Sequence, residues 1–250
     1  MKVTDYAGLS HFQEFCKDLD DNYVVVGGFA TIMLLDKQLE GHGKATYDID
    51  LVLLTNNSLE MSKRIKKYIK EGDYKIQIGE KDQYRYYRFT EPKKDDFAKE
   101  IELFASNEND LKLEDSQRII PIDPDEGLYS LSAIMLDQEY FEMIKENVDK
   151  TGVAPCTNVQ ATIILKMSAF YDLKNRGEDK WKKHRRDIFK LTLLLTGEEK
   201  LKLKGRMQGD FDSFIAHIEN DLTAKDIKNF SDGLPIIKED VIKILKEVFI

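Results

Sequence analysis

Cysteine, proline and long apolar runs are all scarce in this sequence, and each scarcity excludes a class of protein. Two cysteines, Cys16 and Cys156, are too few for a disulfide framework, and they lack the spacing of metal ligands. The longest nearly apolar stretch, residues 24–35, is too short to span a bilayer and contains two glycines. Because the N-terminal residues also lack an apolar signal core, we expect a cytoplasmic protein with no membrane partner.

The composition is that of a globular chain. Of 250 residues, 42% are hydrophobic, which is too high a fraction for a disordered protein, and the length suits one large domain or two small ones. The chain has 38 Lys and Arg residues against 46 Asp and Glu residues, a net charge of −8. A negative surface repels a polyanion, so a general nucleic-acid coat protein is excluded, although a local basic patch is not.

Hydrophobic periodicity divides the chain into two parts. In the first part the pattern predicts helices at 9–19, 29–39 and about 58–71, a hairpin loop at 91–96, and strands at 23–26, 48–54, 74–78, 84–89 and 99–104. In the second part it predicts helices at 133–148, 157–173, 181–195, 205–222 and 240–249. We therefore expect an α+β sheet domain at residues 1–130 and a helical domain at residues 131–250.

The most informative motif has two parts. Gly27 and Gly28 end a predicted strand and begin a helix, where close backbone approach and free N–H groups favour phosphate. Asp48 and Asp50 follow on the next predicted strand and point to the same face because strand side chains alternate. Two adjacent carboxylates repel each other unless a cation lies between them, and oxygen ligands with phosphate suit Mg²⁺. Either part alone is usually a turn or a cap, but their order favours a catalytic site.

A third acid would complete such a site. Glu102 is the leading candidate because a strand at 99–104 beside the Asp48 strand would turn it toward both aspartates. Glu100 shares that face and is the alternative, and a solvent-facing edge strand would explain both glutamates without function. Arg85 and Arg88 lie three apart on another predicted strand and face opposite sides, and we favour neither as a phosphate ligand.

Basic residues stand out in the second part. Lys166 lies on or beside the apolar stripe of its predicted helix, so it needs an anionic partner, either a triphosphate or a nearby acid. Residues 174–190 hold eight Lys or Arg residues against three acids, a net charge of +5. This stretch could hold phosphates, or it could be a solvated helix face in which Asp187 pairs with Lys183.

At these residues the sequence resembles the nucleotidyltransferase superfamily related to DNA polymerase β. The resemblance rests on Gly27-Gly28 and on Thr46-Tyr47-Asp48-Ile49-Asp50. The layout of the second part is similar to the AbiEii-type family, whose members include toxins of toxin–antitoxin systems. Lys166 matches the lysine helix of that family, and the stretch 183–188 matches a later basic-plus-Asp motif. The chain departs from the pattern in having Glu102 where Asp is commoner, and in a late motif that reads Lys-His-Arg-Arg-Asp.

The resemblance implies a polymerase β-type mixed sheet with flanking helices, followed by a helical domain. It also implies transfer of a nucleoside monophosphate from an NTP, with Mg²⁺, to a hydroxyl or phosphate acceptor such as RNA, and an antitoxin protein as a partner. The implied catalytic and metal residues are Asp48, Asp50 and Glu102, and the implied nucleotide-binding residues are Gly27, Gly28, Lys166 and Asp187. Two alternatives stay open: a catalytically degenerate nucleotide- or protein-binding member of this fold, and a small-molecule nucleotidyltransferase that modifies an antibiotic-like hydroxyl.

Overall fold

The protein forms two compact units. The computed structural model describes residues 6–39, 42, 46–54, 59–78, 84–106, 119–121 and 132–250. Unit 1 comprises Met1–Ala30 and Ala45–Thr157, and unit 2 comprises Thr31–Lys44 and Asn158–Ile250. The predicted domain boundary lies after residue 130, whereas the chain finally leaves unit 1 after Thr157.

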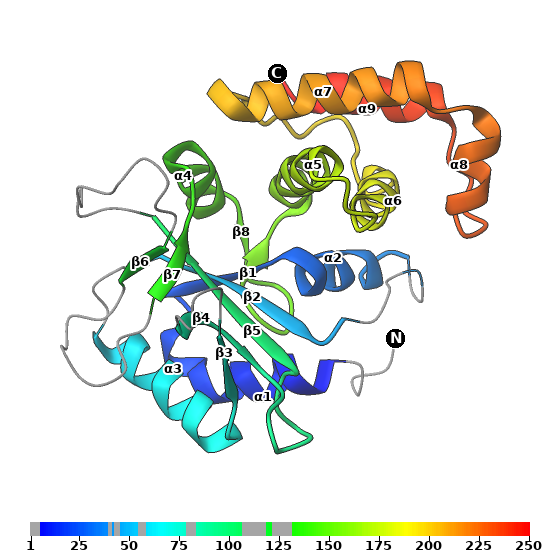
Figure 1. Cartoon of the computed structure of the whole chain (residues 1–250). Coiled ribbons are helices and arrows are strands. Elements are labelled where there is room, and N and C mark those ends of the chain that lie inside the picture. The colour runs from blue at the N-terminus through cyan, green and yellow to red at the C-terminus, as the bar shows by residue number, and fades with distance from the viewer. Residues whose placement is uncertain are drawn as a thin grey trace. The chain divides into compact units, whose positions relative to one another are not determined.

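Unit 1 is built on one mixed β-sheet (Figure 1). The strands run in the order β3-β4-β5-β2-β1-β9-β8, with β7 paired to β5 and β6 paired to β7. The β1–β2 and β4–β5 pairs are antiparallel, whereas the β2–β5 pair is parallel. The strands are β1 Tyr23–Val26, β2 Asp48–Leu53, β3 Lys75–Ile78, β4 Tyr84–Thr90, β5 Glu100–Ala105, β6 Ile119–Pro121, β7 Ser132–Met135, β8 Val148–Asp149 and β9 Cys156–Thr157.

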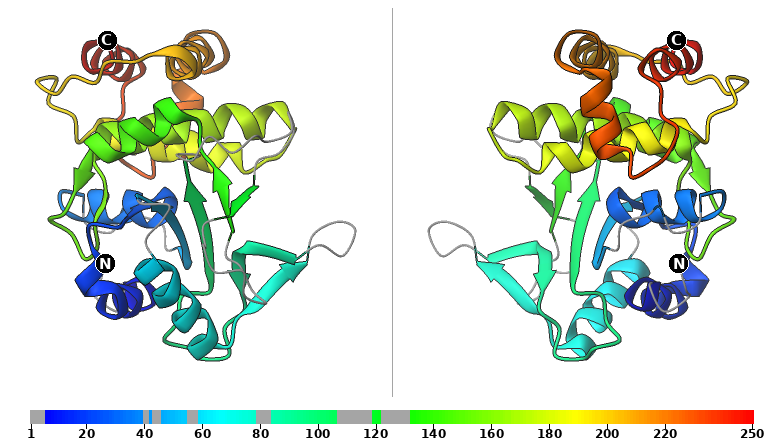
Figure 2. Two further views of the ribbon diagram at one scale, coloured as in Figure 1. Left: turned by 90° about the vertical axis from the view of Figure 1, so that its left-hand side faces the viewer. Right: turned by 90° about the vertical axis from the view of Figure 1, so that its right-hand side faces the viewer.

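Helices α1 (Ala7–Cys16) and α3 (Leu59–Gly72) cover one face of this sheet, and α4 (Gln138–Glu146) lies on the other side (Figures 1 and 2). A 3-10 turn, η2 (Lys17–Leu19), extends α1. Phe12 of α1 packs edge-on against Tyr23 of β1 and Tyr68 of α3, with ring centroids 5.6 and 5.1 Å apart. Alternate residues of the two central strands are buried toward these helices: Ile49, Leu51 and Leu53 of β2, and Ile101, Leu103 and Ala105 of β5. Asp48 and Asp50 of β2, and Glu100 and Glu102 of β5, lie on the opposite face of these strands.

Unit 2 is helical. Helix α2 (Gly27–Asp36) begins in unit 1 and its later residues belong to unit 2. The other helices are α5 Val159–Asn175, α6 Trp181–Thr192, α7 Gly205–Asp221, α8 Ala224–Phe230 and α9 Lys238–Val248. The Asn158 side chain begins α5 by accepting a hydrogen bond of 3.0 Å from the Ala161 N–H. Phe170, Phe189 and Phe214 fill the core between α5, α6 and α7.

The mixed α+β architecture confirms the predicted fold class, and most predicted elements are present within two or three residues of their expected bounds. The predicted helix at 133–148 is wrong in its first turn, because Ser132–Met135 forms strand β7 and the helix begins only at Gln138. Ile134 pairs with Phe104 of β5 and with Ile119 of β6. These partners are distant in sequence, so local periodicity could not reveal the strand. The short elements α8, β6, β8 and β9 were also not predicted.

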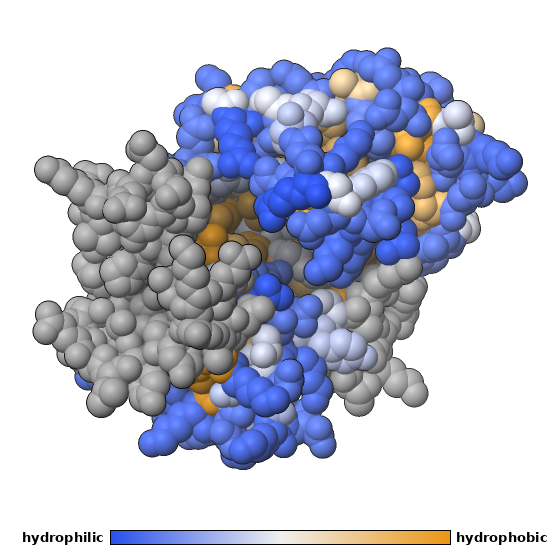
Figure 3. Space-filling view, viewed as in Figure 1, coloured by the Kyte–Doolittle hydropathy of each residue, from blue (hydrophilic) through white to orange (hydrophobic). Residues whose placement is uncertain are grey.

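Two further observations concern the cysteines and the length of the helices. Cys16 and Cys156 are both buried thiols, and burial raises the pKa of the Cys16 thiol to about 12. Within the described ranges, every helix is too short or too polar to cross a bilayer. The described surface seen in Figure 3 is mostly hydrophilic, as expected for a chain with 34% charged residues.

Candidate active site

Four carboxylates share one face of the sheet. The parallel register of β2 and β5 places Asp48 beside Glu100 and Asp50 beside Glu102. Paired residues on adjacent strands point to the same side and lie only about 5 Å apart, so like charges there repel. We call these four residues the acidic face. Burial alternates along both strands, so these four side chains point away from the face that carries Ile49 and Ile101.

The diglycine bend lies directly against Asp50. Gly27 has φ +67° and is the first residue of α2. A Cβ atom built on Gly27 would overlap Asp50 Oδ2, and one on Gly28 would lie 2.9 Å from Thr46 Oγ1. The Asp50 carboxylate is thus at the N-terminal end of α2, where the helix dipole is positive and the first N–H groups are not used within the helix. This is the juxtaposition of glycines and aspartate that the sequence motif predicts.

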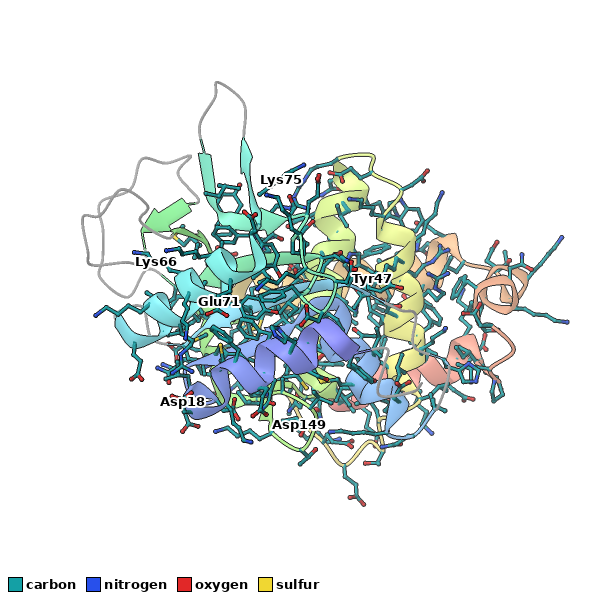
Figure 4. All side chains as sticks on the ribbon, turned by 90° about the horizontal axis from the view of Figure 1, so that it is seen from below. Asp18, Tyr47, Lys66, Glu71, Lys75 and Asp149 are labelled. Atoms are coloured by element: carbon teal, nitrogen blue, oxygen red, sulfur yellow. The ribbon has the colours of Figure 1, made fainter. Side chains whose placement is uncertain are left out.

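The acids differ in exposure. Asp48 is exposed, and its carboxylate has no hydrogen-bond or ion-pair partner among the described residues. Asp50 is half-buried, and the side chains of Glu100 and Glu102 are 21% and 20% exposed. Tyr47, which precedes Asp48 and is labelled in Figure 4, is 63% exposed. Solvent, and therefore a small ligand, can reach the Asp48 end of the acidic face.

Arg88 of β4 is the cation that the sequence reading did not assign to the site. Antiparallel pairing places it opposite Glu102 on β5. Its Nη2 atom lies 2.6 Å from Glu100 Oε1, and its Nη1 atom lies 3.9 Å from Glu102 Oε1. Residue spacing along one strand cannot reveal this contact, because it depends on the register between two strands.

The donor set of the acidic face fits a hard divalent cation. All four acids offer oxygen ligands, and Mg²⁺ in proteins is commonly held by one or two carboxylates together with phosphates and water. Asp48 and Asp50 match that number and donor type. Among the residues that the structure describes, no three His, Cys, Asp or Glu side chains converge on a single point as metal ligands.

Lys166 and Asp187, the two predicted nucleotide-binding residues of unit 2, bind each other. Lys166 Nζ on α5 donates a hydrogen bond of 2.8 Å to Asp187 Oδ2 on α6, and the two side chains are only 4% and 8% exposed. Lys166 therefore has the nearby acid that was one of its two expected partners, and this acid pairs with Lys166 rather than with Lys183. A role for either residue in nucleotide binding stays a prediction.

His184 lies close to this buried pair. Burial, and secondarily the positive charge of Lys166, lower the pKa of its imidazole from 6.5 to about 4. Its Nδ1 atom is buried and has no hydrogen-bond partner among the described residues. The histidine is accordingly neutral at physiological pH.

Five of the eight cations in the basic stretch at 174–190 have local partners. Arg185 lies between the rings of Trp181 and Phe230, at 4.9 and 4.5 Å from their centroids. Four other cations have acidic or histidine partners within unit 2: Lys174 with His217 and Asp221, Arg176 with Glu178, Lys182 with Asp179, and buried Lys190 with Asp232. For these five residues, the contacts favour a structural role over phosphate binding.

Comparison with known proteins yields one remote likeness. No protein-family model matches the chain, and no curated protein matches its sequence. Among solved structures, the chain is similar to the crystal structure of an antigenic nucleotidyltransferase-like protein from Paracoccidioides brasiliensis, with a TM-score of 0.49 and 13% identity over 96% of this chain and 97% of that chain. At this level of identity and TM-score, the likeness assigns neither an activity nor a residue role to this chain.

Proposed function

We propose that the protein is a metal-dependent nucleotidyltransferase, which moves a nucleoside monophosphate from an NTP to a hydroxyl or phosphate acceptor. One observation carries the proposal: the Asp50 carboxylate lies against Gly27 at the start of α2, with Asp48 on the same face of the same strand. A carboxylate pair beside a glycine-rich helix start combines cation ligands with a phosphate site.

The residues of unit 1 divide the chemistry among them. Asp48 and Asp50 would hold Mg²⁺, and the N–H groups of the first turn of α2 would bind phosphate oxygens. Bound Mg²⁺ would neutralise the triphosphate and orient it for in-line displacement. For a hydroxyl acceptor, Glu102 would accept the proton as the acceptor oxygen bonds to the α-phosphorus and the bond to the leaving pyrophosphate breaks.

The acceptor that we propose is RNA, on the strength of the sequence resemblance to AbiEii-type proteins, with an antitoxin protein as partner. A small-molecule hydroxyl is the alternative acceptor. A non-catalytic nucleotide-binding protein is the second candidate function, and the position of Arg88 favours it. Because its guanidinium is 2.6 Å from Glu100 and 3.9 Å from Glu102, it supplies a positive charge that a metal ion would otherwise bring.

The test is transfer of label from each of the four α-phosphate-labelled NTPs in MgCl₂. Bulk RNA, an aminoglycoside-type acceptor and the protein alone are supplied in parallel. Asp50→Asn and Asp48→Asn should each lower the transfer rate on the order of 10³-fold, equivalent to ~4 kcal/mol of transition-state stabilisation. Asp95→Asn is the matched control, because the Asp95 side chain is fully exposed in the β4–β5 loop and its variant should keep at least half of the rate.

Calorimetric titration of Mg²⁺ and each NTP separates the two candidates. Binding that depends on Asp48 and Asp50, without transfer to any acceptor, would support the non-catalytic protein. Transfer at the wild-type rate by both aspartate variants would show that the acidic face is not the active site.

A further inference from the structure

The acidic face has an unbalanced distribution of charge. Two carboxylate pairs, Asp48 with Glu100 and Asp50 with Glu102, stand side by side on adjacent parallel strands. Across the next strand pair, β4 places Arg88 opposite Glu102 and Thr90 opposite Glu100. The positive charge that β4 brings to this face therefore lies on the glutamate side and not on the aspartate side.

Arg88 contacts both glutamates but does not bind either carboxylate through two N–H groups. It makes one short contact with Glu100 and a longer one with Glu102, its side chain is 33% exposed, and its buried Nε atom has no hydrogen-bond partner among the described residues. A guanidinium has five N–H donors in a fixed fork and binds most strongly when two of them meet one carboxylate. The contacts of Arg88 fall short of that geometry.

Arg64 of α3 shows the tighter arrangement in the same unit. Its Nη1 and Nη2 atoms donate hydrogen bonds of 2.6 and 2.8 Å to the two oxygens of Asp18, and Nη1 also donates to the Phe15 carbonyl. Glu60 lies 4.0 Å away. Arg64 therefore resembles Arg88 in having two acidic neighbours, but its guanidinium is bound as a fork to one of them.

We propose that Arg88 is a resident counter-cation of the acidic face, which neutralises Glu100 and Glu102 in the metal-free protein and thereby limits the affinity of the face for a divalent cation. This inference rests on the proposed function, because it takes the acidic face as the metal site. Arg88 and Glu100 are then positioning residues, and Glu102 is the third acid of the site. The physical reason is that the charge of Arg88 offsets like-charge repulsion when no metal is bound and repels the metal when it arrives.

The experiment compares Arg88→Met with the matched control Arg64→Met, without nucleotide. Thermal unfolding is measured in EDTA and in MnCl₂, and Mn²⁺ binding is measured by electron paramagnetic resonance. We expect Arg88→Met to unfold several degrees below wild type in EDTA and to recover most of that loss in MnCl₂. Its Mn²⁺ affinity should rise about tenfold, the order expected for removing one nearby positive charge at an effective dielectric constant of about 20. Arg64→Met should lose stability equally in both solutions.

Two further variants connect the effect to charge and to the acidic face. Arg88→Lys should keep the wild-type Mn²⁺ affinity, and adding Asp50→Asn to Arg88→Met should abolish the recovery in MnCl₂. If Arg88→Met does not fold in EDTA, its refolding yield in MnCl₂ is measured instead. Recovery supports the proposal, and equal failure in both solutions overturns it.

An unchanged or weaker Mn²⁺ affinity in Arg88→Met would also overturn the proposal, because Arg88 would then only stabilise the fold. These results are independent of transfer. If the wild type transfers no label but Arg88→Met binds Mn²⁺ more tightly than the wild type, the proposed enzyme activity is rejected and the proposed role of Arg88 is supported. If the wild type transfers label but Arg88→Met does not bind Mn²⁺ more tightly, only the proposed role of Arg88 is rejected.

Discussion

The acidic face of unit 1 and the Lys166–Asp187 pair of unit 2 differ in how their charged side chains are arranged. On the acidic face, like charges stand beside one another on a partly exposed sheet surface, and Arg88 contacts the two glutamates. Between α5 and α6, one ammonium and one carboxylate are almost wholly buried and bind each other at 2.8 Å. The first arrangement places like charges side by side, whereas the second places opposite charges in direct contact.

This difference in burial and pairing predicts different effects of substitution. Burying an ion pair costs desolvation free energy. Removing one partner is nevertheless strongly destabilising, because the other charge is then left buried without a partner or water. Gathered carboxylates repel each other, and they gain stability when a cation arrives. Variants of the buried pair should therefore change folding stability first, and variants of the acidic face should change ligand binding first.

The largest effect on stability is expected from breaking the buried pair. Lys166→Met leaves the Asp187 carboxylate buried without its cation and should lower the free energy of unfolding by about 3–5 kcal/mol, as measured in urea. The double variant Lys166→Met with Asp187→Leu should recover most of this loss, because no charge is then left unpaired. If Lys166→Met lowered the free energy of unfolding by less than ~1 kcal/mol, the buried pair would not have the structural role that distinguishes it from the acidic face.

The neighbouring histidine should make unit 2 sensitive to acid. The pKa of His184 is lowered from 6.5 to about 4 by burial and by Lys166, so below pH 6.5 the unfolded chain takes up a proton that the folded chain resists. The stabilising effect of the neutral imidazole is complete above pH 6.5 and is lost as pH falls toward 4. The total is about 3 kcal/mol of unfolding free energy.

Urea unfolding of wild type and His184→Gln at several pH values between 4 and 7.5 checks this dependence. The difference in unfolding free energy between the two proteins should vary with pH across the window from 6.5 to 4. Lys182→Gln, an exposed change on the same helix, should leave the wild-type pH dependence intact. A pH-independent difference for His184→Gln would show that folding does not shift the pKa of His184.

A substitution at Gly27 tests the contact between the diglycine bend and the acidic face. Gly27→Ala introduces a Cβ that overlaps Asp50 Oδ2 and places alanine at φ +67°, so it should cost about 2 kcal/mol and weaken Mg²⁺–NTP binding. Gly177→Ala is the matched control, since it has φ +72° but nothing within 4 Å of its Cβ. The control should cost only about 1 kcal/mol. Equal losses in unfolding free energy, with equal NTP binding, would mean that Asp50 can move away from the bend without consequence.

The smallest effect is expected from an exposed ion pair in the same helical unit. Lys182 Nζ lies 2.5 Å from Asp179, but the two side chains are 56% and 87% exposed. Because water screens such a pair, Lys182→Gln should change the unfolding free energy by no more than about 0.5 kcal/mol. A loss comparable with that of Lys166→Met would show that burial is not what distinguishes the two pairs.

Local patterns were sufficient for much of the fold. Strand β1 was predicted from the run Tyr23-Val24-Val25-Val26, and helices α5, α6, α7 and α9 from their apolar periodicity. These features depend on neighbours within a few residues. Strand β7 was mistaken for helix because its pairing with Phe104 and Ile119 is set by residues far away in the chain.

The pair of same-face aspartates and the glycine bend follow from the residue pattern alone, because strand alternation and glycine conformation are local properties. Which charges meet depends instead on how separate elements pack. The register between β4 and β5 brings Arg88 to Glu100, and the packing of α5 on α6 joins Lys166 to Asp187. Such contacts depend on how separate elements align in space, and the spacing of residues along the chain does not encode that alignment directly.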